Sequence, residues 1–286
     1  MGVCSPVIDS SPVDLRTAAS IEAAEARAWA DLYAAAPADW ATDVGLATRK
    51  VAGALMLQWA ATGRRYFSRV IGLGVAEPAR PLAIDEILAG YDDAGISMFL
   101  LQSLPHCRPG EYEGWLRERG FEPFDAQDRV LRDGSPLAAA RVPPTSRELA
   151  VERVTRETAE EWVEFLERVY RLDTGPWLPN LIGRAGWKQY VAREDGAVVG
   201  ARGMHIGADG TAWLGMDGPV PGVMTDDYEP DAALLAFMVA DGLVNGARRF
   251  IADIELPSVD QATPAYESFG RLGFTRPYVR RHWTRL

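Results

Sequence analysis

The order of hydrophobic and polar positions repeats once along the chain. The first half predicts a strand, a helix, a strand and a second helix, at 69–75, 84–91, 99–103 and the segment that ends at Gly120–Phe121. The second half predicts the same order, at 213–216, 235–242, 250–255 and the segment that ends at Gly273–Phe274. A mostly antiparallel sheet with helices beside it is therefore expected in each half.

Equivalent positions in the two halves are separated by nearly constant intervals. The intervals are 143 residues from Gly72 to Gly215, 151 from Gly95 to Gly246, 151 from Phe99 to Phe250 and 153 from Gly120 to Gly273. Such a narrow drift predicts an internal duplication. The alternative is that any α/β protein places glycine after helices and phenylalanine in strands.

A proline-rich segment separates the halves. Residues 133–147 read DGSPLAAARVPPTSR and show no period, and proline at this density continues neither a helix nor an interior strand. We therefore expect a first domain over 1–132, a linker over 133–147 and a second domain over 148–286.

The sequence also predicts elements outside the repeated segments of each half. In the second half, 149–154 predicts a strand, 162–169 a helix face, and 187–193 with 197–206 a hairpin about Asp195–Gly196. In the first half, 21–33 predicts an alanine-rich helix, 55–59 a strand and 127–132 a strand-like tail. The last residues, 275–285, predict a second such tail.

The run from Ala265 to Phe274, AYESFGRLGF, resembles the fourth helix and following turn of the GNAT family of N-acetyltransferases. That family shows Asn-x-x-Ala-x-x-Leu-Tyr-x-x-x-Gly-Phe there, and Ala265, Phe269 and Leu272 form one apolar stripe. The resemblance implies two tandem GNAT-like α/β (α+β) domains. It also implies an acyl-CoA cosubstrate, whose pyrophosphate binds a glycine-rich loop at a helix N-terminus.

That loop departs from the family pattern in this chain. Registering the helix that follows puts Asp226 at the usual Gln or Arg, Glu229 at a glycine and Asp231 at the Gly or Ala, while Pro230 removes an amide donor. One carboxylate about 5 Å from a phosphate charge costs roughly 3 kcal/mol, against about 8 kcal/mol for micromolar binding. Acetyl-CoA is therefore expected to bind weakly, and no cofactor to bind tightly. Asp231 is also expected to cap the helix.

Candidate catalytic groups follow the family's use of a carboxylate base near the fourth and fifth strands. Asp217 lies at the end of one strand, and Asp253 and Glu255 share a face of the next, about 7 Å apart. The family's general-acid tyrosine is replaced by Phe269, so Tyr266, one turn away, is the candidate acid. Each of these has a structural alternative: solvated carboxylates and a packed ring.

Other side chains suggest binding rather than catalysis. Tyr170, Trp177 and Trp187 lie near the expected acceptor site, where they would line a pocket or belong to the core. His205 is a weaker candidate base. His106 and Cys107 are adjacent but lack a third ligand at any recognisable spacing, so no metal is expected.

Composition narrows the environment and the partners. Net charge is −10 over 286 residues, which argues against nucleic acid. Two cysteines without a paired spacing suit a reducing compartment, and no secretory signal is readable at the N-terminus. The apolar stretch 51–62 is too short to span a bilayer. A cytoplasmic protein without a membrane partner is expected, of undetermined oligomeric state.

Two functions of different class remain open. One is an acyltransferase that moves an acetyl or other acyl group, from acyl-CoA or another activated donor, to an amine of a small molecule. The other is a non-catalytic GNAT-like binding or structural module that has lost acetyl-CoA binding. Fem-type aminoacyl transferases also have tandem folds of this kind without the loop, but the acidic charge argues against tRNA.

Overall fold

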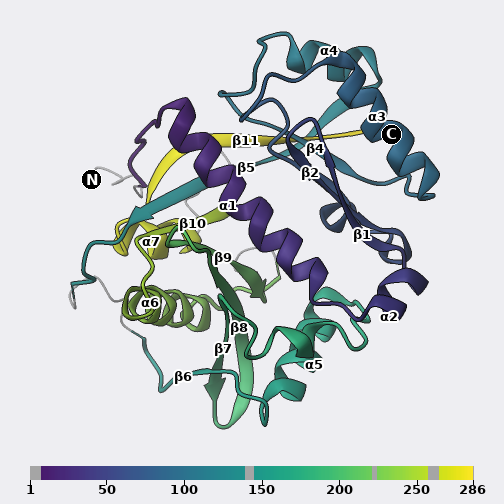
Figure 1. The fold of residues 1–286 in the computed structure, drawn as a ribbon. Coiled ribbons are helices and arrows are strands. Elements are labelled where there is room, and N and C mark those ends of the chain that lie inside the picture. Colours follow the sequence, from purple (N-terminus) through teal and green to yellow (C-terminus); the bar gives the residue numbers. More distant parts are fainter. Residues whose placement is uncertain (1–7, 139–144, 221–223, 257–263, 286) are drawn as a thin grey trace. The chain divides into compact units, whose positions relative to one another are not determined.

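Two compact units make up the computed structural model, which describes residues 8–138, 145–220, 224–256 and 264–285 (Figure 1). The N-terminal unit is Pro12–Gln127 with Tyr278–Leu286, and the C-terminal unit is Asp128–Pro277 with Met1–Ser11. Residues 139–144 of the expected linker lie outside the described residues.

This division differs from the linear one expected from the sequence. Strands β5 (Phe121–Asp133) and β11 (Thr275–Arg285) each run from one unit into the other, with the boundaries after Gln127 and Pro277. Residues 278–286 thus belong to the N-terminal unit, and residues 128–277 belong to the C-terminal unit. A linear cut near 133–147 would leave each half without a strand of its own sheet.

The N-terminal unit is a mixed sheet in the order β1-β2-β3-β4-β11-β5. β3 and β4 are parallel, and β1–β2, β2–β3 and β4–β11 are antiparallel. Its other elements are α1 (Leu15–Ala34), α2 (Ala38–Asp43), β1 (Leu46–Val51), β2 (Ala54–Trp59), η1 (Ala60–Thr62), η2 (Arg65–Phe67), β3 (Arg69–Ile71), α3 (Pro81–Asp93), β4 (Leu100–Ser103) and α4 (Tyr112–Glu118).

The C-terminal unit is also a mixed sheet, in the order β5-β10-β9-β8-β7-β6. β9 and β10 are parallel, and β6–β7, β7–β8 and β8–β9 are antiparallel. Its other elements are β6 (Ala150–Arg153), α5 (Ala159–Tyr170), η4 (Leu178–Leu181), β7 (Trp187–Glu194), β8 (Ala197–Ile206), β9 (Thr211–Gly218), α6 (Glu229–Val244), β10 (Arg249–Glu255) and α7 (Pro264–Arg271). The predicted fold class, a mixed and mostly antiparallel sheet with helices in each half, is confirmed.

Alternation along the strands sorts side chains to the two faces of the C-terminal sheet. Phe250, Ala252 and Ile254 of β10 share a core cluster with residues of α6 and α7. Residues 251, 253 and 255 therefore face the other side, where α5 packs against β8 and β9. This assignment decides which of the candidate carboxylates lie together.

Local turn chemistry agrees with the sequence where it is strongest. Asp195 and Gly196, between β7 and β8, both have positive φ, at 50° and 82°, as a tight two-residue hairpin requires. Gly273, at φ 86°, ends the segment of α7. By contrast, β3 ends at Ile71, because Gly72 (φ 84°) leaves the extended conformation, and not at residue 75 as predicted.

A buried ionic network joins α1 to β3 and β11 within the N-terminal unit. Glu22 and Glu25 are 2% and 0% exposed, and Arg280 is 0% exposed. Arg280 contacts both carboxylates, at 3.2 Å for Nη1 to Oε2 of Glu22, while Arg69 Nη2 lies 3.1 Å from Oε1 of Glu25. The Tyr278 hydroxyl donates to Glu22 at 2.8 Å. The last strand of the chain thus supplies both Arg280 and Tyr278 to the carboxylates of α1.

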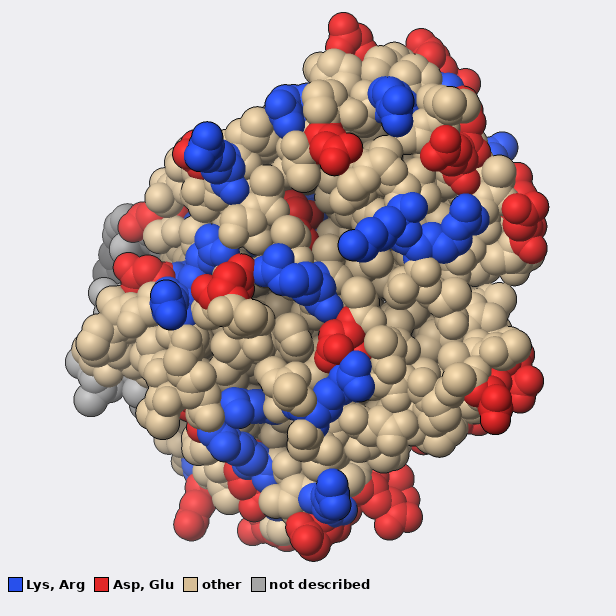
Figure 2. Space-filling model, viewed as in Figure 1, with Lys and Arg blue, Asp and Glu red and all other residues tan. Residues whose placement is uncertain are grey.

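Charged side chains are interspersed on the visible surface. On the face shown in Figure 2, basic groups alternate with acidic groups and neutral surface and form no continuous field. Among the described residues, no helix has both the length and the apolar character needed to cross a membrane.

Candidate active site in the C-terminal unit

Strands β9 and β10 separate after a short parallel ladder. They pair only at Thr211–Arg249, Ala212–Phe250 and Trp213–Ile251 within the described residues. Beyond these pairs β9 runs to Gly218 and β10 to Glu255. The backbone ladder thus ends before the carboxyl ends of the two parallel strands, and we call this divergence the opening. The carboxyl ends of parallel strands are the usual place for a ligand in α/β proteins.

A bulge lies in β9 at this opening. Ala201 pairs with Gly218 and Gly203 with Gly215, so Arg202 of β8 lies opposite two residues, Met216 and Asp217. Met216 has φ 53°, a left-handed conformation that costs energy for a residue with a side chain. A strained residue at the mouth of a diverging strand pair marks a candidate functional position.

Arg202 is the centre of a charged cluster behind the bulge. Its Nε and Nη2 donate to Oδ1 and Oδ2 of Asp231 at 2.6 and 3.0 Å, and Nη2 lies 3.9 Å from Oδ2 of Asp217. Burial alone would lower the pKa of Arg202, but the two carboxylates outweigh it and the net shift is upward. Burial raises the pKa of Asp231, which Arg202 opposes. Arg202 and Asp231 thus form an ion pair that is almost fully shielded from water.

The expected cap at Asp231 is wrong. The N-cap of α6 is Tyr228, without a side-chain capping bond, and Asp231 lies inside the first turn. Its carboxylate turns inward to Arg202 and leaves only 8% of the side chain exposed. The guanidinium of Arg202 outcompetes the local N–H groups because it forms two hydrogen bonds between opposite charges, in the bidentate geometry that is strongest for a carboxylate.

Asp217 is the candidate carboxylate that meets the opening. Its side chain is 32% exposed and lies on the α6 side of the sheet, beside Arg202. Its backbone oxygen accepts a hydrogen bond from the hydroxyl of Tyr170, so α5 is fastened to the end of β9. Burial raises the pKa of Tyr170, which keeps this hydroxyl a donor.

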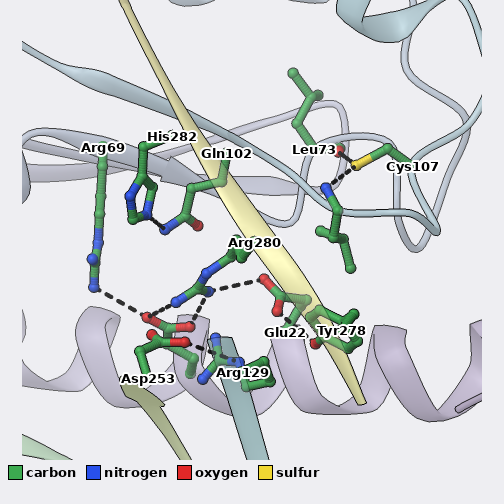
Figure 3. Close-up of polar contacts among 12 residues, drawn as sticks. Glu22, Arg69, Leu73, Gln102, Cys107, Arg129, Asp253, Tyr278, Arg280 and His282 are labelled. Carbon is green, nitrogen blue, oxygen red and sulfur yellow. Dashed lines mark hydrogen bonds and ion pairs between the residues drawn. The ribbon is translucent and has the colours of Figure 1, made fainter. Parts of the chain in front are cut away.

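Asp253 and Glu255 lie on the opposite face from Asp217. Asp253 pairs with the fully buried Arg129 of β5, at 3.4 Å between Oδ1 and Nε (Figure 3). Glu255 is exposed at the end of β10. The structure therefore brings Asp217 together with Arg202 and Asp231, and it does not bring Asp217 onto one face with the β10 carboxylates.

Tyr266 lies in the core of the α6 side. It is 5% exposed and belongs to the cluster that contains Phe269 and Ile254. In the described part of the chain its hydroxyl has no hydrogen-bond partner. A buried hydroxyl normally has a hydrogen-bond partner, so Tyr266 stays a candidate for contact with a ligand.

The aromatic candidates for an acceptor pocket are mainly core residues. Trp177 and Trp187 are 1% and 4% exposed. Trp187 packs against His205, with ring centroids 5.0 Å apart, and against Trp213 at 6.2 Å. Of the three predicted pocket residues, only Tyr170 reaches the opening, through Asp217.

The acidic end of α6 is occupied by the chain itself. Glu229 accepts hydrogen bonds from the backbone N–H and the hydroxyl of Ser146, at 2.9 and 2.5 Å. Arg147 contacts Asp227 and lies 3.1 Å from Glu194 and 3.9 Å from Glu229. Asp226 is exposed beside them.

These contacts do not fit a pyrophosphate at the end of α6. The positions that would need bare backbone carry Glu229 and Asp231, each committed to a partner, and Pro230 has no N–H. Of the three carboxylates predicted to repel a phosphate, Glu229 and Asp231 have cationic partners, so the repulsion is smaller than three free charges would give. Even so, side chains of the described residues occupy the end of α6 where a pyrophosphate would bind.

Other sequence candidates have structural partners. Cys107 donates to the oxygen of Leu73 at 3.4 Å and accepts from the N–H of Leu104, and burial raises the pKa of its thiol to about 12 (Figure 3). His106 Nε2 contacts the backbone oxygen of Val13. Within the described ranges, no three His, Cys, Asp or Glu side chains converge as a metal site.

Sequence reasoning missed Arg202, Met216 and Arg147. Arg202 interrupts the apolar sequence of β8 between Ala201 and Gly203, which is a signal that a buried partner exists. The left-handed backbone of Met216 and the contacts of Arg147 with the end of α6 give no signal in the neighbouring sequence. Both depend on segments that are distant in sequence.

Comparison with known proteins shows the fold. No protein-family model and no curated protein matches the chain. A GCN5-related N-acetyltransferase from Kribbella flavida is similar over 96% of both chains, with a TM-score of 0.62 and 15% identity. A tandem GNAT protein from the clavulanic acid biosynthesis pathway covers 82% of this chain and 78% of its own (TM-score 0.53, 14% identity).

A GCN5-related N-acetyltransferase from Sphaerobacter thermophilus is also similar, over 80% of this chain and 79% of its own, with a TM-score of 0.52 and 15% identity. The chain therefore has the GNAT fold along nearly its whole length. The resemblance seen in the sequence is confirmed at that level.

Proposed function

We propose that the C-terminal unit is an N-acyltransferase that acts where β9 and β10 separate, on an activated acyl donor and an amine of a small molecule. The observation that carries the proposal is the bulge of β9. Met216, at φ 53°, lies at the mouth of a parallel pair that ends after three residues, in a chain with the fold of N-acetyltransferases.

The backbone of β9 supplies the electrophilic part of the site. Beyond Trp213, β9 has no ladder partner on its β10 side among the described residues. N–H groups on that side are available to the carbonyl oxygen of the donor. Preorganised donors of this kind stabilise the negative charge that develops when the amine attacks.

Two side chains on the same face supply the proton transfers. The partly exposed carboxylate of Asp217 accepts the proton of the attacking amine, directly or through water, and Arg202 holds it in place. The hydroxyl of Tyr266, which has no partner in the described residues, donates to the leaving group. Asp253 and Glu255 face the other way, and Asp253 is paired with Arg129, so neither takes part in these proton transfers.

A non-catalytic binding module is the second candidate, and a specific observation favours it. Ser146 and Arg147 occupy the end of α6 where this fold would hold a pyrophosphate. A chain that had lost its donor site would retain the fold and the buried ion pairs without turnover.

Thiol release separates the two candidates. The intact protein would be assayed with acetyl-CoA and longer acyl-CoAs against a panel of small amines, and screened for thermal stabilisation. A ligand at 100 times its Kd adds about 2.7 kcal/mol of stability. Turnover with any pair supports the enzyme, whereas neither turnover nor stabilisation with any donor supports the module.

Two variants then test the assigned residues. Asp217→Asn is expected to lower kcat by about 100-fold or more, and Tyr266→Phe to lower it while preserving the fold. Asp195→Asn, in the exposed hairpin turn, is the matched control and should retain full activity. Unchanged turnover in Asp217→Asn would remove the base from the proposal.

A further inference from the structure

A polar cavity lies at the other end of the C-terminal sheet from the β9 bulge. It measures about 330 Å³ and is lined by the start of β7, the turn between β8 and β9, and the residues that follow α6. This size is at the lower end of the range for small-molecule sites. Lys188 of β7 and Arg248 contribute the two charged side chains of its lining.

Neither of these cations is in direct contact with a carboxylate in the described part of the chain. Among the described residues, no hydrogen bond or ion pair engages the side chain of Lys188 or of Arg248. The charge of Asp241 favours the ammonium form of Lys188, but this carboxylate is paired with Arg153 and accepts from the Tyr190 hydroxyl. Asp209, in the turn between β8 and β9, lies 4.0 Å from Arg249 and accepts from the N–H of Thr211. The chain contains only two lysines, and one of them lies here.

Gly210 contacts both the backbone and the side chain of Arg248 at the wall of the cavity. Gly210 has φ 75°, and a Cβ there would lie 3.0 Å from Cγ of Arg248. The arginine stem therefore passes directly over the glycine. The N–H of Arg248 also donates to the oxygen of Gly210 at 2.7 Å. A Cβ at position 210 would require the stem of Arg248 to shift.

The adjoining end of α6 does not account for both charges. The carbonyl groups of Asp241, Gly242 and Leu243 already accept backbone hydrogen bonds from residues 245–247. The remaining helix dipole amounts to roughly half an elementary charge. The two cations that line the cavity outweigh this partial negative charge.

We infer that this cavity binds a phosphate group, held between the ammonium of Lys188 and the guanidinium of Arg248. A phosphate monoester carries about −1.5 to −2 charges at pH 7, which matches two cations better than a single carboxylate does. Arginine binds phosphate oxygens through a planar fork, and lysine as a point charge. The site is separate from the β9 bulge, so it stands or falls independently of the acyltransferase proposal.

A bound phosphate would change the protonation of Lys188. Partial burial and the nearby Arg153 lower the pKa of Lys188, and Asp241 only partly opposes them. A bound dianion would favour the charged ammonium and so reverse that shift. Binding is therefore expected to take up protons at alkaline pH, which calorimetry in two buffers of different ionisation enthalpy detects.

Titration of the intact protein with inorganic phosphate tests the site, in a chloride background of constant ionic strength. Glycerol 3-phosphate is the parallel probe, and it distinguishes a monoester site from one that takes free phosphate only. We expect saturable binding, weakened about tenfold or more in Lys188→Gln and in Arg248→Gln. Arg156→Gln, which removes one exposed charge from the same unit, is the matched control and should bind within about twofold of the parent chain.

The folding of each variant is checked by its urea unfolding midpoint. The proposal would be overturned if neither probe bound saturably to the parent chain. So would equal affinity in the parent chain and in both pocket variants, since binding would then occur elsewhere.

Discussion

Arg202 and Asp231 form a bidentate ion pair that ties β8 to the first turn of α6, with side chains only 5% and 8% exposed. The contact places a fixed positive charge directly behind Asp217 and the bulge of β9. It also turns inward a carboxylate that would otherwise lie at the helix N-terminus. One pair therefore shapes both the candidate catalytic position and the donor loop.

Removing one member of this pair should destabilise the C-terminal unit strongly. Asp231→Ala leaves the buried guanidinium of Arg202 without its main partner, which is expected to lower the free energy of unfolding by about 3–5 kcal/mol. Urea unfolding measures the change. Asp226→Ala, exposed on the same loop, should stay within about 0.5 kcal/mol of the parent. Similar small effects in both variants would contradict the structural role of the pair.

Acetyl-CoA should bind weakly, with a Kd well above the micromolar range by calorimetry at moderate salt. Glu229, held by Ser146 and near Arg147, occupies the end of α6, and Pro230 offers no N–H. The double change Asp226→Arg with Glu229→Gly should tighten binding by about tenfold, since it removes two like charges and adds a cation. Asp231 is retained in this variant because its loss would unpair Arg202. Micromolar binding by the parent chain would refute the expectation.

Truncation after Pro277 should unfold or severely destabilise the N-terminal unit, although it deletes only the end of the chain. Residues 278–286 carry Arg280 and Tyr278, which partner the buried carboxylates of Glu22 and Glu25. The single change Arg280→Ala is expected to lower the free energy of unfolding by about 3–5 kcal/mol. Arg285→Ala, exposed near the same terminus, serves as the control. If the truncated chain keeps the parent's unfolding midpoint, residues 278–286 do not complete this unit.

The stability of the N-terminal unit should fall as the pH drops below the usual histidine range. Burial lowers the pKa of His282 below 6.5, an effect that its contact with Asp125 only partly opposes. The unfolded chain therefore binds a proton at a higher pH than the folded unit does. The stability contributed by neutral His282 is fully present above about pH 6.5 and is lost as the pH falls towards the lowered value. Urea midpoints at about pH 7.5, 6.5 and 5.5 measure this slope, and His282→Gln should flatten it.

Local features were readable because they depend on a few neighbouring residues. The hairpin at Asp195–Gly196 and the stop at Gly273 follow from backbone conformations that these residues adopt readily, and both lie where the pattern predicts. The repeated order of elements and the fold class follow from periodicity over ten or so residues. The strand β1 was missed because four of its six residues, from Ala47 to Lys50, are exposed, so it has no apolar stripe.

The tertiary structure alone decided which groups share a site and which strands share a sheet. Nothing local distinguishes Asp231 as a cap from Asp231 as the partner of Arg202, 29 residues away. The same holds for Arg280, whose buried partners Glu22 and Glu25 lie more than 250 residues earlier. Sequence pattern determined the elements because their hydrogen bonds and faces are local. It could not determine that β5 and β11 each run from one unit into the other, because that depends on long-range strand pairing. It also could not determine that Asp217 and Asp253 lie on different faces, because that depends on the face to which each strand turns its side chains.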